Sequence, residues 1–308
     1  MAHVVVSGGA GFIGSHIVEL MLEEGHELLV LDDLSSGSRD NLFLEAEFRE
    51  IDIRSRDLKP LLDEFRPDVF IHAAAQISVT ESMKDPVYDA EVNVCGLLNI
   101  LHSLGGRTLP YFVFLSTGGA IYGEQEDFPA DEGHKIEPTS VYGTSKRVSE
   151  LYLALWGRVY GLKYVALRLA NVYGPRQNPH GEAGVVAIFN NRLLRGGTPV
   201  IYGSGEQTRD FVFVKDVAQA VALVCRDRIQ GIFNIGTGRE TSVNALYEII
   251  CGVLGITRQP LYQPAREGEQ MRSSISAVAA RRTFGWQPAY TLEEGLRQTC
   301  EWFQAKAA

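Results

Sequence analysis

Short hydrophobic segments alternate with longer amphipathic segments along the first half of the chain. The hydrophobic segments are rich in β-branched residues and nearly free of polar positions, which is typical of parallel strands buried on both faces. We predict strands at 3–7, 27–32, 68–73, 111–116 and 163–169. Helical periodicity between them predicts helices that include 12–24, 87–104 and 141–160. This order predicts an α/β fold with a doubly wound parallel sheet.

The pattern changes after Asn171, where proline and glycine become frequent. We predict a helix at 182–195, a strand at 211–214, a helix at 216–226, a strand at 231–235 and further helices from Ser242 onward. These elements predict a smaller, mostly C-terminal α/β domain. Residues 1–172 and about 206–238 would then form the larger domain, and about 173–205 and 239–308 the smaller one.

A glycine-rich loop follows the first predicted strand and opens the first predicted helix. It contains Gly8, Gly11 and Gly14, and glycine lets the backbone turn tightly and approach a pyrophosphate. The helix N-terminus, with Phe12 and Ile13, offers N–H donors and the positive end of the helix dipole. Because this loop joins a strand to a helix, it predicts a dinucleotide site and a Rossmann-like sheet.

An acidic pair, Asp32 and Asp33, ends the second predicted strand, and Asp32 lies 18 positions after Gly14. A carboxylate at this position would accept hydrogen bonds from the adenosine ribose and repel a 2′-phosphate, which favours NAD over NADP. In the alternative interpretation, Asp32 only caps the turn that follows. Arg39 is interpreted as a solvated loop residue.

Tyr142 and Lys146 form a Tyr-x-x-x-Lys motif at the start of a long predicted helix. Residues four apart lie on one helix face, so the phenol and the ammonium group can converge. A free tyrosine has a pKa of about 10, too high for a base at neutral pH. A neighbouring cation, helped by an oxidised nicotinamide, would lower the pKa of Tyr142 and so make it a candidate base.

Together these motifs resemble those of the extended short-chain dehydrogenase/reductase superfamily, and within it the UDP-glucose (UDP-galactose) 4-epimerases. The resemblance covers nearly the whole chain and includes further motifs at 52–53, 72–76, 93, 116–123, 171–176, 209–211 and 266–269. It implies that Asp52 and Ile53 face the adenine and that Asn93 lies near the active site. The implied cofactor residues are Gly8, Gly11, Phe12, Ile13, Gly14, Asp32, Asp33, Asp52, Ile53, Ala74, Gln76, Asn93, Ser116, Tyr142 and Lys146.

The resemblance also implies contacts with a UDP-sugar substrate. Arg209 and Arg266 match positions that clamp the pyrophosphate, for which arginine has a bidentate geometry, whereas by themselves they would suggest surface ion pairs. The other implied contacts are Glu269 with the uridine ribose, Asn171 with sugar or phosphate, and Val185 and Tyr202 with the uracil site. Ser273 matches a gate beside the sugar 2-position, and its small side chain predicts that N-acetylhexosamines are also accepted.

One position departs from the epimerase pattern. Such epimerases usually carry a Ser or Thr two residues after a first strand-end Ser, and here that position is Gly118. We predict that Thr117 donates the missing hydrogen bond to the sugar 4-hydroxyl; alternatively, Thr117 is only a strand-end residue and Tyr142 with Lys146 suffices. Gly118 and Gly119 have no acidic side chain, which argues against the related 4,6-dehydratases and decarboxylases.

Composition and charge narrow the possible partners. The 308-residue chain has 29 Lys and Arg against 38 Asp and Glu, a formal net charge of −9, which argues against nucleic acid and anionic membranes as partners. Its four cysteines are widely spaced, which suits a reducing cytoplasmic compartment. We expect no signal peptide and no membrane span. The histidines lack ligand spacing, so we also expect no metal.

The leading hypothesis is an NAD-dependent isomerase that epimerises UDP-galactose and UDP-glucose, with UDP-GalNAc and UDP-GlcNAc as further substrates. The reaction would pass through a transient 4-keto sugar with Tyr142 as base. Two alternatives stay open: another nucleotide-sugar epimerase or reductase, such as a UDP-uronate 4-epimerase, and a non-catalytic NAD-binding protein. The resemblance also implies a homodimer through helices 87–104 and 141–160, whose apolar faces would equally suit packing against the sheet.

Overall fold

The computed structural model describes residues 1–308 except 107, 181–183, 266–269 and 308. Its largest sheet has seven parallel strands in the order β11-β6-β5-β4-β1-β2-β3. These strands are β1 (His3–Ser7), β2 (Glu27–Asp32), β3 (Glu47–Glu50), β4 (Val69–His72), β5 (Tyr111–Thr117), β6 (Tyr164–Leu169) and β11 (Gly231–Ile235). The predicted fold class, with its Rossmann-like doubly wound parallel sheet, is confirmed.

The strand order reverses beside β1. From β1 the chain moves outward through β2 to β3, then crosses back to β4 and continues through β5 and β6 in the opposite direction. In sheets of this kind, ligands bind in the crevice at the carboxyl ends of the strands on either side of such a reversal. The loops that follow β1 and β4 are therefore the expected frame of a binding site.

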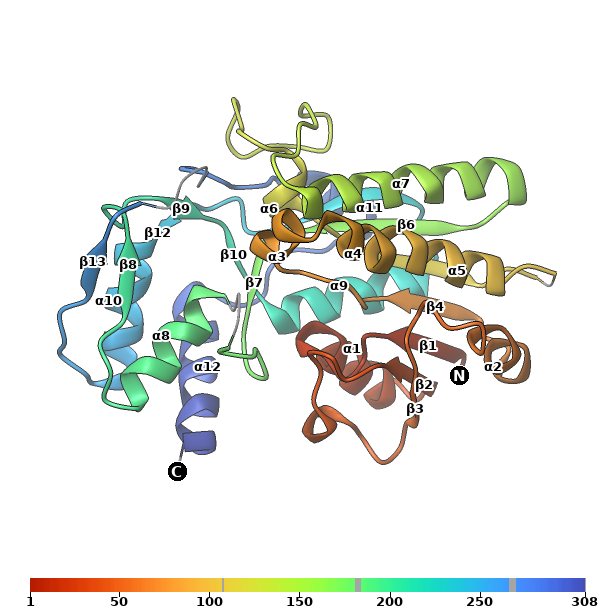
Figure 1. Ribbon diagram of the computed structural model, residues 1–308, viewed down its shortest axis with the longest axis horizontal. Coiled ribbons are helices and arrows are strands. Elements are labelled where there is room, and N and C mark those ends of the chain that lie inside the picture. The colour runs from red at the N-terminus through yellow and green to blue at the C-terminus, as the bar shows by residue number, and fades with distance from the viewer. Residues whose placement is uncertain (107, 181–183, 266–269, 308) are drawn as a thin grey trace.

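Successive residues of β1 enter two hydrophobic cores, one on each face of the sheet. Val4 and Val6 pack in the core with α1 and α9, whereas Val5 packs in the core with α2, α5 and α7. These helices are α1 (Phe12–Glu23), α2 (Leu58–Phe65), α5 (Gly96–Ser103), α7 (Val141–Tyr160) and α9 (Val214–Asp227). Figure 1 shows α1 and α9 on one side of the sheet and α5 and α7 on the other. Burial of both faces explains the nearly continuous hydrophobic segments of the sequence.

A smaller group of elements lies beside the sheet, on the left of Figure 1. Its members are α8 (Val185–Leu194), β8 (Val200–Tyr202), α10 (Val243–Leu254), β13 (Leu261–Gln263) and α12 (Leu292–Ala307), and β8 pairs with β13. Their core includes Phe189, Ile201, Leu246 and Leu296. Two short ladders lie between this group and the sheet: β7 (Asn171–Tyr173) with β10 (Phe211–Phe213), and β9 (Thr208–Arg209) with β12 (Thr241–Ser242).

The helix predicted at 87–104 is present as an unbroken helical segment over residues 86–103, with a π-helical turn (Glu91–Cys95) between α4 (Pro86–Ala90) and α5. A separate short helix, α3 (Val79–Lys84), precedes it. The wider turn inserts an extra residue and re-aims the side chains on either side of it. Other short elements are a 3-10 turn (Arg39–Asn41), α6 (Gly118–Ile121) and α11 (Val278–Phe284). Among the helices in the described part of the chain, none has the length and hydrophobicity to cross a membrane.

Candidate active site

A cavity of about 1190 Å³ lies at the carboxyl ends of β1 and β2. Most of the predicted cofactor residues line it, namely Gly8, Gly11, Phe12, Ile13, Gly14, Asp32, Asp33, Asp52, Ile53, Ala74 and Gln76. The other four, Asn93, Ser116, Tyr142 and Lys146, are not among the lining residues that the structure describes. The fold thus brings together segments that are widely separated in the sequence, at the crevice expected from the strand order.

The glycine-rich loop forms one wall of this cavity, and side chains cannot be added to it freely. Gly8 has a φ of +75°, and a Cβ there would lie 2.5 Å from the backbone nitrogen of Ala74. A Cβ at Gly14 would overlap the carbonyl oxygen of Gly8. Gly11 precedes α1, and among the residues that the structure describes no side chain caps that helix N-terminus. The loop therefore leaves backbone N–H groups at the cavity wall, where they can bind an anion.

Asp32 connects the glycine-rich loop to the turn after β2. Its two carboxylate oxygens accept hydrogen bonds from the backbone nitrogens of Ala10 (3.0 Å) and Leu34 (2.9 Å). Burial raises the pKa of Asp32, and these two N–H donors oppose that rise. The turn-capping interpretation therefore describes real hydrogen bonds of Asp32. The same carboxylate lines the cavity, so the two predicted roles are compatible.

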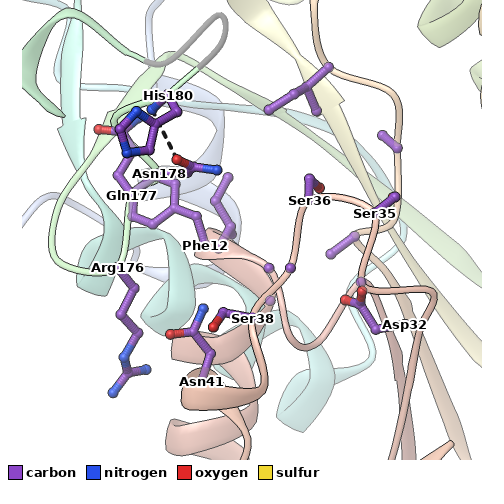
Figure 2. Close-up of a pocket in the computed structure, with 18 of the residues that line it drawn as sticks. Phe12, Asp32, Ser35, Ser36, Ser38, Asn41, Arg176, Gln177, Asn178 and His180 are labelled. Carbon is purple, nitrogen blue, oxygen red and sulfur yellow. Dashed lines mark hydrogen bonds between the residues drawn. The ribbon is translucent and has the colours of Figure 1, made fainter. Parts of the chain in front are cut away.

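The opposite wall comes from the smaller group of elements. Figure 2 shows Gln177, Asn178 and His180 across the cavity from Asp32, with Phe12 between the two sides. Helix α12 adds Trp302, Phe303 and Lys306 to the lining. The Lys306 ammonium group lies 3.2 Å from the Asp40 carboxylate, so an ion pair joins the last helix to the loop after β2. The sequence analysis missed these α12 residues, because a helix pattern does not show which strand ends the helix will face.

Asp52 and Ile53, which the resemblance places beside the adenine, follow the edge strand β3. Asp52 pairs with Arg54, with the closest nitrogen and oxygen 2.6 Å apart, and this hydrogen bond lowers the pKa of Asp52. Ile53 is buried and packs against Gly96, where a Cβ would lie 2.6 Å from the Ile53 Cδ1. An apolar side chain beside a charged pair can pack against one face of a planar nucleobase.

The predicted catalytic pair lies at the N-terminus of α7. Ser140 caps this helix by accepting a hydrogen bond from the Gly143 backbone nitrogen (3.1 Å), and the Tyr142 nitrogen donates to the Ser82 hydroxyl (3.1 Å). The Lys146 Nζ lies 5.9 Å from the centre of the Tyr142 ring and donates to the carbonyl oxygen of Leu115 (3.1 Å). The helix therefore holds both groups on one face beside the end of β5, as the spacing predicts.

Burial dominates the acid–base properties of this pair. It raises the pKa of Tyr142, which the negative charge of Asp89 raises further and a hydrogen bond with Thr117 lowers. Burial also lowers the pKa of Lys146 to about 8. In the protein alone, loss of solvation therefore sets the direction of the shift in the pKa of Tyr142. The predicted lowering of this pKa needs the neighbouring cation together with an oxidised nicotinamide, and it stays a prediction.

The replacement of a hydroxyl by glycine at position 118 has a packing reason. A Cβ on Gly118 would lie 2.5 Å from Cδ1 and 3.2 Å from Cγ2 of Ile275, which is 1% exposed. Thr117, one residue earlier, hydrogen-bonds the Tyr142 phenol. Ser116 instead donates to the buried Glu150 carboxylate (2.7 Å). Thr117 is therefore the strand-end hydroxyl that reaches the tyrosine.

The predicted substrate residues come from several elements, and two of them, Asn171 and Ser273, lie near the end of β5. Asn171 begins β7, and its Oδ1 lies 3.2 Å from where a Cβ on Gly119 would be, whereas Ser273 is buried two residues before Ile275. Arg209 lies in β9 and donates to the carbonyl oxygen of Thr208 (2.8 Å). Val185 begins α8 and Tyr202 ends β8. Arg266 and Glu269 lie outside the described residues.

The sequence matches the family model of the NAD dependent epimerase/dehydratase family over residues 4–236. This chain belongs to that family. The superfamily predicted from the motifs is confirmed, and NAD is the cofactor of this epimerase/dehydratase family member.

Three relatives are similar to this family member over almost its whole length. The UDP-glucose 4-epimerase of Mycolicibacterium smegmatis is 43% identical over 309 residues, which cover 98% of this chain and 99% of the relative. The structure of UDP-glucose 4-epimerase with UDP-glucose from Thermotoga maritima is 44% identical, with a TM-score of 0.96, and the match covers 99% of this chain and 100% of that one. The Thermus thermophilus UDP-glucose 4-epimerase in complex with NAD is 44% identical, with a TM-score of 0.93 and 98% coverage of both chains.

The cavity of this epimerase/dehydratase family member fits NAD. Its volume suits a dinucleotide, its glycine-rich wall leaves no room for a Cβ at Gly8 or Gly14, and free helix N–H groups face it. The carboxylates of Asp32 and Asp33 line the same cavity, and carboxylates after the second strand are suited to accept hydrogen bonds from a ribose and to repel a 2′-phosphate. Gly8, Gly11 and Gly14 would therefore hold the pyrophosphate and Asp32 the adenosine ribose.

Proposed function

We propose that this chain is an NAD-dependent UDP-hexose 4-epimerase that interconverts UDP-galactose and UDP-glucose. One observation carries the proposal: the phenol of the half-buried Tyr142 is hydrogen-bonded to the strand-end hydroxyl of Thr117 and lies beside the ammonium-bearing side chain of Lys146. This arrangement can remove a proton from a sugar hydroxyl and return it. The names of the relatives, which cover this chain from end to end, support the same activity.

In the proposed reaction, Tyr142 takes the proton of the sugar 4-hydroxyl and Thr117 hydrogen-bonds that hydroxyl group. Bound NAD⁺ supplies the hydride acceptor and a positive charge that favours the Tyr142 phenolate, which burial alone disfavours. Lys146 adds a second positive charge beside the phenol. The 4-keto sugar would then turn about its bond to the pyrophosphate, so that C4 regains the hydride on its other face while Tyr142 returns the proton to the 4-oxygen.

We also propose roles for the residues around this centre. The residues lining the cavity near β1, β2 and β4 would bind NAD, whereas Asn171, Val185, Tyr202, Arg209, Arg266, Glu269 and Ser273 would bind the UDP-sugar. Residues 1–172 with about 206–238 would be the cofactor domain, and about 173–205 with 239–308 the nucleotide-sugar domain. The separate hydrophobic core around α8, α10 and α12 supports this division. Four free cysteines are in keeping with a reducing cytoplasm.

The small, buried Ser273 supports a broad choice of sugar. A serine leaves more room beside the sugar 2-position than a bulky aromatic residue would, so we propose that UDP-N-acetylhexosamines are substrates too. The ratio of kcat/KM for UDP-GlcNAc and UDP-glucose tests this. A ratio below about 1:1000, which corresponds to roughly 4 kcal/mol, would contradict it.

The outer faces of α7 and of the α3–α4 segment suit a second copy of this chain. Leu151, Leu155 and Val159 are 53%, 38% and 60% exposed on α7, and Met83 and Val87 are exposed on the neighbouring α3 and α4. Two such helical surfaces would bury each other in a four-helix arrangement. We propose a homodimer, which light scattering would report as twice the 34.0 kDa chain mass. Leu155→Glu should give monomers, and Leu44→Glu, on an exposed loop, should not.

Turnover of UDP-galactose tests the proposed activity. The protein is incubated with UDP-galactose and NAD without added reductant, and UDP-glucose is followed by nuclear magnetic resonance. We expect equilibration of the two sugars, and Tyr142→Phe should lower kcat by about 10²–10⁴-fold, the usual contribution of a positioned acid or base. Tyr152→Phe, later on the same helix, is the matched control and should keep its activity.

The alternatives give different results in the same assay. Stoichiometric loss of NADH with a keto-sugar would indicate a reductase. Faster conversion of a UDP-uronate than of UDP-galactose would indicate a uronate epimerase. Binding of NAD without conversion of any nucleotide sugar would indicate a non-catalytic protein, and each of these outcomes contradicts the proposed function.

A further inference from the structure

Asp89 is a fully buried carboxylate near the predicted catalytic pair, and the sequence analysis did not single it out. It lies in α4, just before the π-helical turn. One of its oxygens accepts a hydrogen bond from the Ser145 hydroxyl (2.6 Å). The other accepts from the side-chain amides of Gln76 (2.8 Å) and Asn93 (3.0 Å). Three segments of the chain therefore meet on this one side chain.

The three partners of Asp89 belong to the segments that build the site. Ser145 immediately precedes Lys146 on α7, and Asn93 lies in the π-helical turn. Gln76 follows β4. Its backbone nitrogen donates to the side-chain oxygen of Asn93 (3.0 Å), and its carbonyl oxygen accepts from the side-chain nitrogen of Asn93 (2.9 Å). A carboxylate that accepts three hydrogen bonds at these distances limits the movement of all three segments.

We propose that Asp89 is a positioning residue for Tyr142 and Lys146. Its carboxylate binds the hydroxyl of Ser145, which lies between these two residues in the sequence of α7, and so fixes the position of that helix. The same carboxylate connects α7 to the loop after β4 through Gln76. This inference rests on the proposed function for the roles of the pair. Asp89 itself acts through its neighbours, since its oxygens are engaged by Ser145, Gln76 and Asn93.

The charge of Asp89 gives this position a second effect. It raises the pKa of Lys146 against the stronger lowering by burial, and it adds to the rise that burial causes in the pKa of Tyr142. Glu150 also raises the pKa of Lys146 but is paired with Arg168. Asp89 therefore keeps protons on both groups: it favours a charged lysine and an un-ionised tyrosine.

Two further groups face this pair. His72, at the end of β4, stays neutral because burial, helped by the charge of Lys146, lowers its pKa to about 3. Arg147, beside Lys146 in the sequence, pairs with Glu150 at 3.1 Å. Replacement of Asp89 by an uncharged side chain of the same shape should therefore change the protonation of Tyr142 and Lys146 without a compensating titration of His72.

Asp89→Asn is the appropriate variant because it removes the charge and can keep the hydrogen bonds. The asparagine oxygen can still accept hydrogen bonds from Gln76 and Asn93, and the Ser145 hydroxyl can turn to accept a hydrogen bond from the asparagine NH₂ group. Loss of the negative charge should lower the pKa of Tyr142 and that of Lys146. Both limbs of the pH profile of kcat/KM should therefore move to lower pH, by about one unit. A purely structural role would lower the whole profile without moving either limb.

Two variants serve as controls for this experiment. Asp85→Asn removes the same charge from an exposed residue at the start of α4, where Asn also serves as an N-cap, and should leave both limbs in place. Ser145→Ala removes the hydroxyl link but no charge, and it should lower kcat without moving the limbs. Unchanged limbs in Asp89→Asn, or full kcat in Ser145→Ala, would overturn the inference.

A measurement independent of turnover separates this inference from the proposed function. The chain has seven lysines, so the ¹³Cε signal of Lys146 can be assigned with Lys146→Arg and titrated in the isotopically labelled protein. The Lys146 titration should lie about one pH unit lower in Asp89→Asn than in the wild type. An identical titration refutes the role of Asp89 even if the enzyme is active. A wild type that converts no UDP-hexose refutes the proposed function even if the titration moves. Should Asp89→Asn not fold, Ser145→Ala still tests the link to α7.

Discussion

Adding a hydroxyl back at position 118 should destabilise the protein through a specific contact. In Gly118→Ser the new Cβ would lie 2.5 Å from the Ile275 Cδ1, far inside ordinary van der Waals distance. Ile275 cannot easily withdraw, because it is 1% exposed and its backbone nitrogen donates to the buried Asp210 carboxylate (3.3 Å). Forcing an extra group into a packed core typically costs about 1–3 kcal/mol. We expect Gly118→Ser to lower the free energy of unfolding by about 2 kcal/mol.

Ile275→Val removes the Cδ1 methyl group that causes this overlap. By itself it should cost about 1 kcal/mol, the usual cost of a lost buried methyl group. In its background, Gly118→Ser should cost less than about 1 kcal/mol, so the two changes should show a coupling energy of about 1–2 kcal/mol. Urea unfolding of the four proteins measures this coupling, provided that the m-values agree.

The control for this cycle is Gly252→Ser. Gly252 lies in α10, and a Cβ there would meet no atom within 4 Å, so a serine should be tolerated without loss of stability. If Gly118→Ser were as stable as the wild type, or if the two substitutions were additive within about 0.5 kcal/mol, Ile275 would not be the reason for glycine at this position.

Three further predictions concern the buried polar groups. Thr117→Val should lower kcat by about 10–100-fold, because one hydrogen bond to an ionising group contributes about 1.5–3 kcal/mol; steady-state kinetics showing nearly full kcat would exclude a catalytic Thr117. Glu150→Gln should lower the free energy of unfolding by about 3 kcal/mol, since it leaves Arg168, 2% exposed, without its charged partner; urea unfolding at wild-type stability would contradict this. Burial lowers the pKa of His16 to about 4 and that of His72 to about 3, so the unfolded chain binds more protons below pH 6.5. Stability should therefore fall between pH 6.5 and 4, by up to about 1.4 kcal/mol per pH unit for each histidine, and a melting temperature that is flat over this range would show the prediction to be wrong.

The sheet and the cofactor loop could be predicted from sequence because their signals are local. A strand buried on both faces, such as Val4–Val6 in β1, gives a continuous hydrophobic segment, and the glycines that follow it report a backbone that admits no Cβ. The edge strand Glu47–Glu50 gave no such signal, because three of its four residues are charged and it is largely exposed. Local sequence patterns therefore predict strands that are buried on both faces, and they miss strands that pack on only one face.

The remaining parts of the site depend on distant contacts. Nothing near Gly118 in the sequence points to Ile275, and the two meet only because the C-terminal segment crosses the end of β5. Asp89 resembles any helix carboxylate until the fold encloses it with Ser145. The rise that burial causes in the pKa of Tyr142 could not be read from the sequence for the same reason, since the spacing of Tyr142 from Lys146 is local and its burial is not. Tertiary contacts decide the packing of Gly118, the burial of Asp89 and the pKa of Tyr142.

The position of Trp302 gives this protein an optical signal of its own. The chain has three tryptophans, all within the described residues: Trp286 is 1% exposed in the core, Trp156 belongs to α7 and packs against the core, and Trp302 alone lines the cavity. Reduced nicotinamide absorbs at the wavelengths where indole emits, so resonance energy transfer from Trp302 to a bound, reduced cofactor would quench its fluorescence. In a variant that keeps only this indole, the emission would follow the redox state of the cofactor inside the working enzyme, without any added dye.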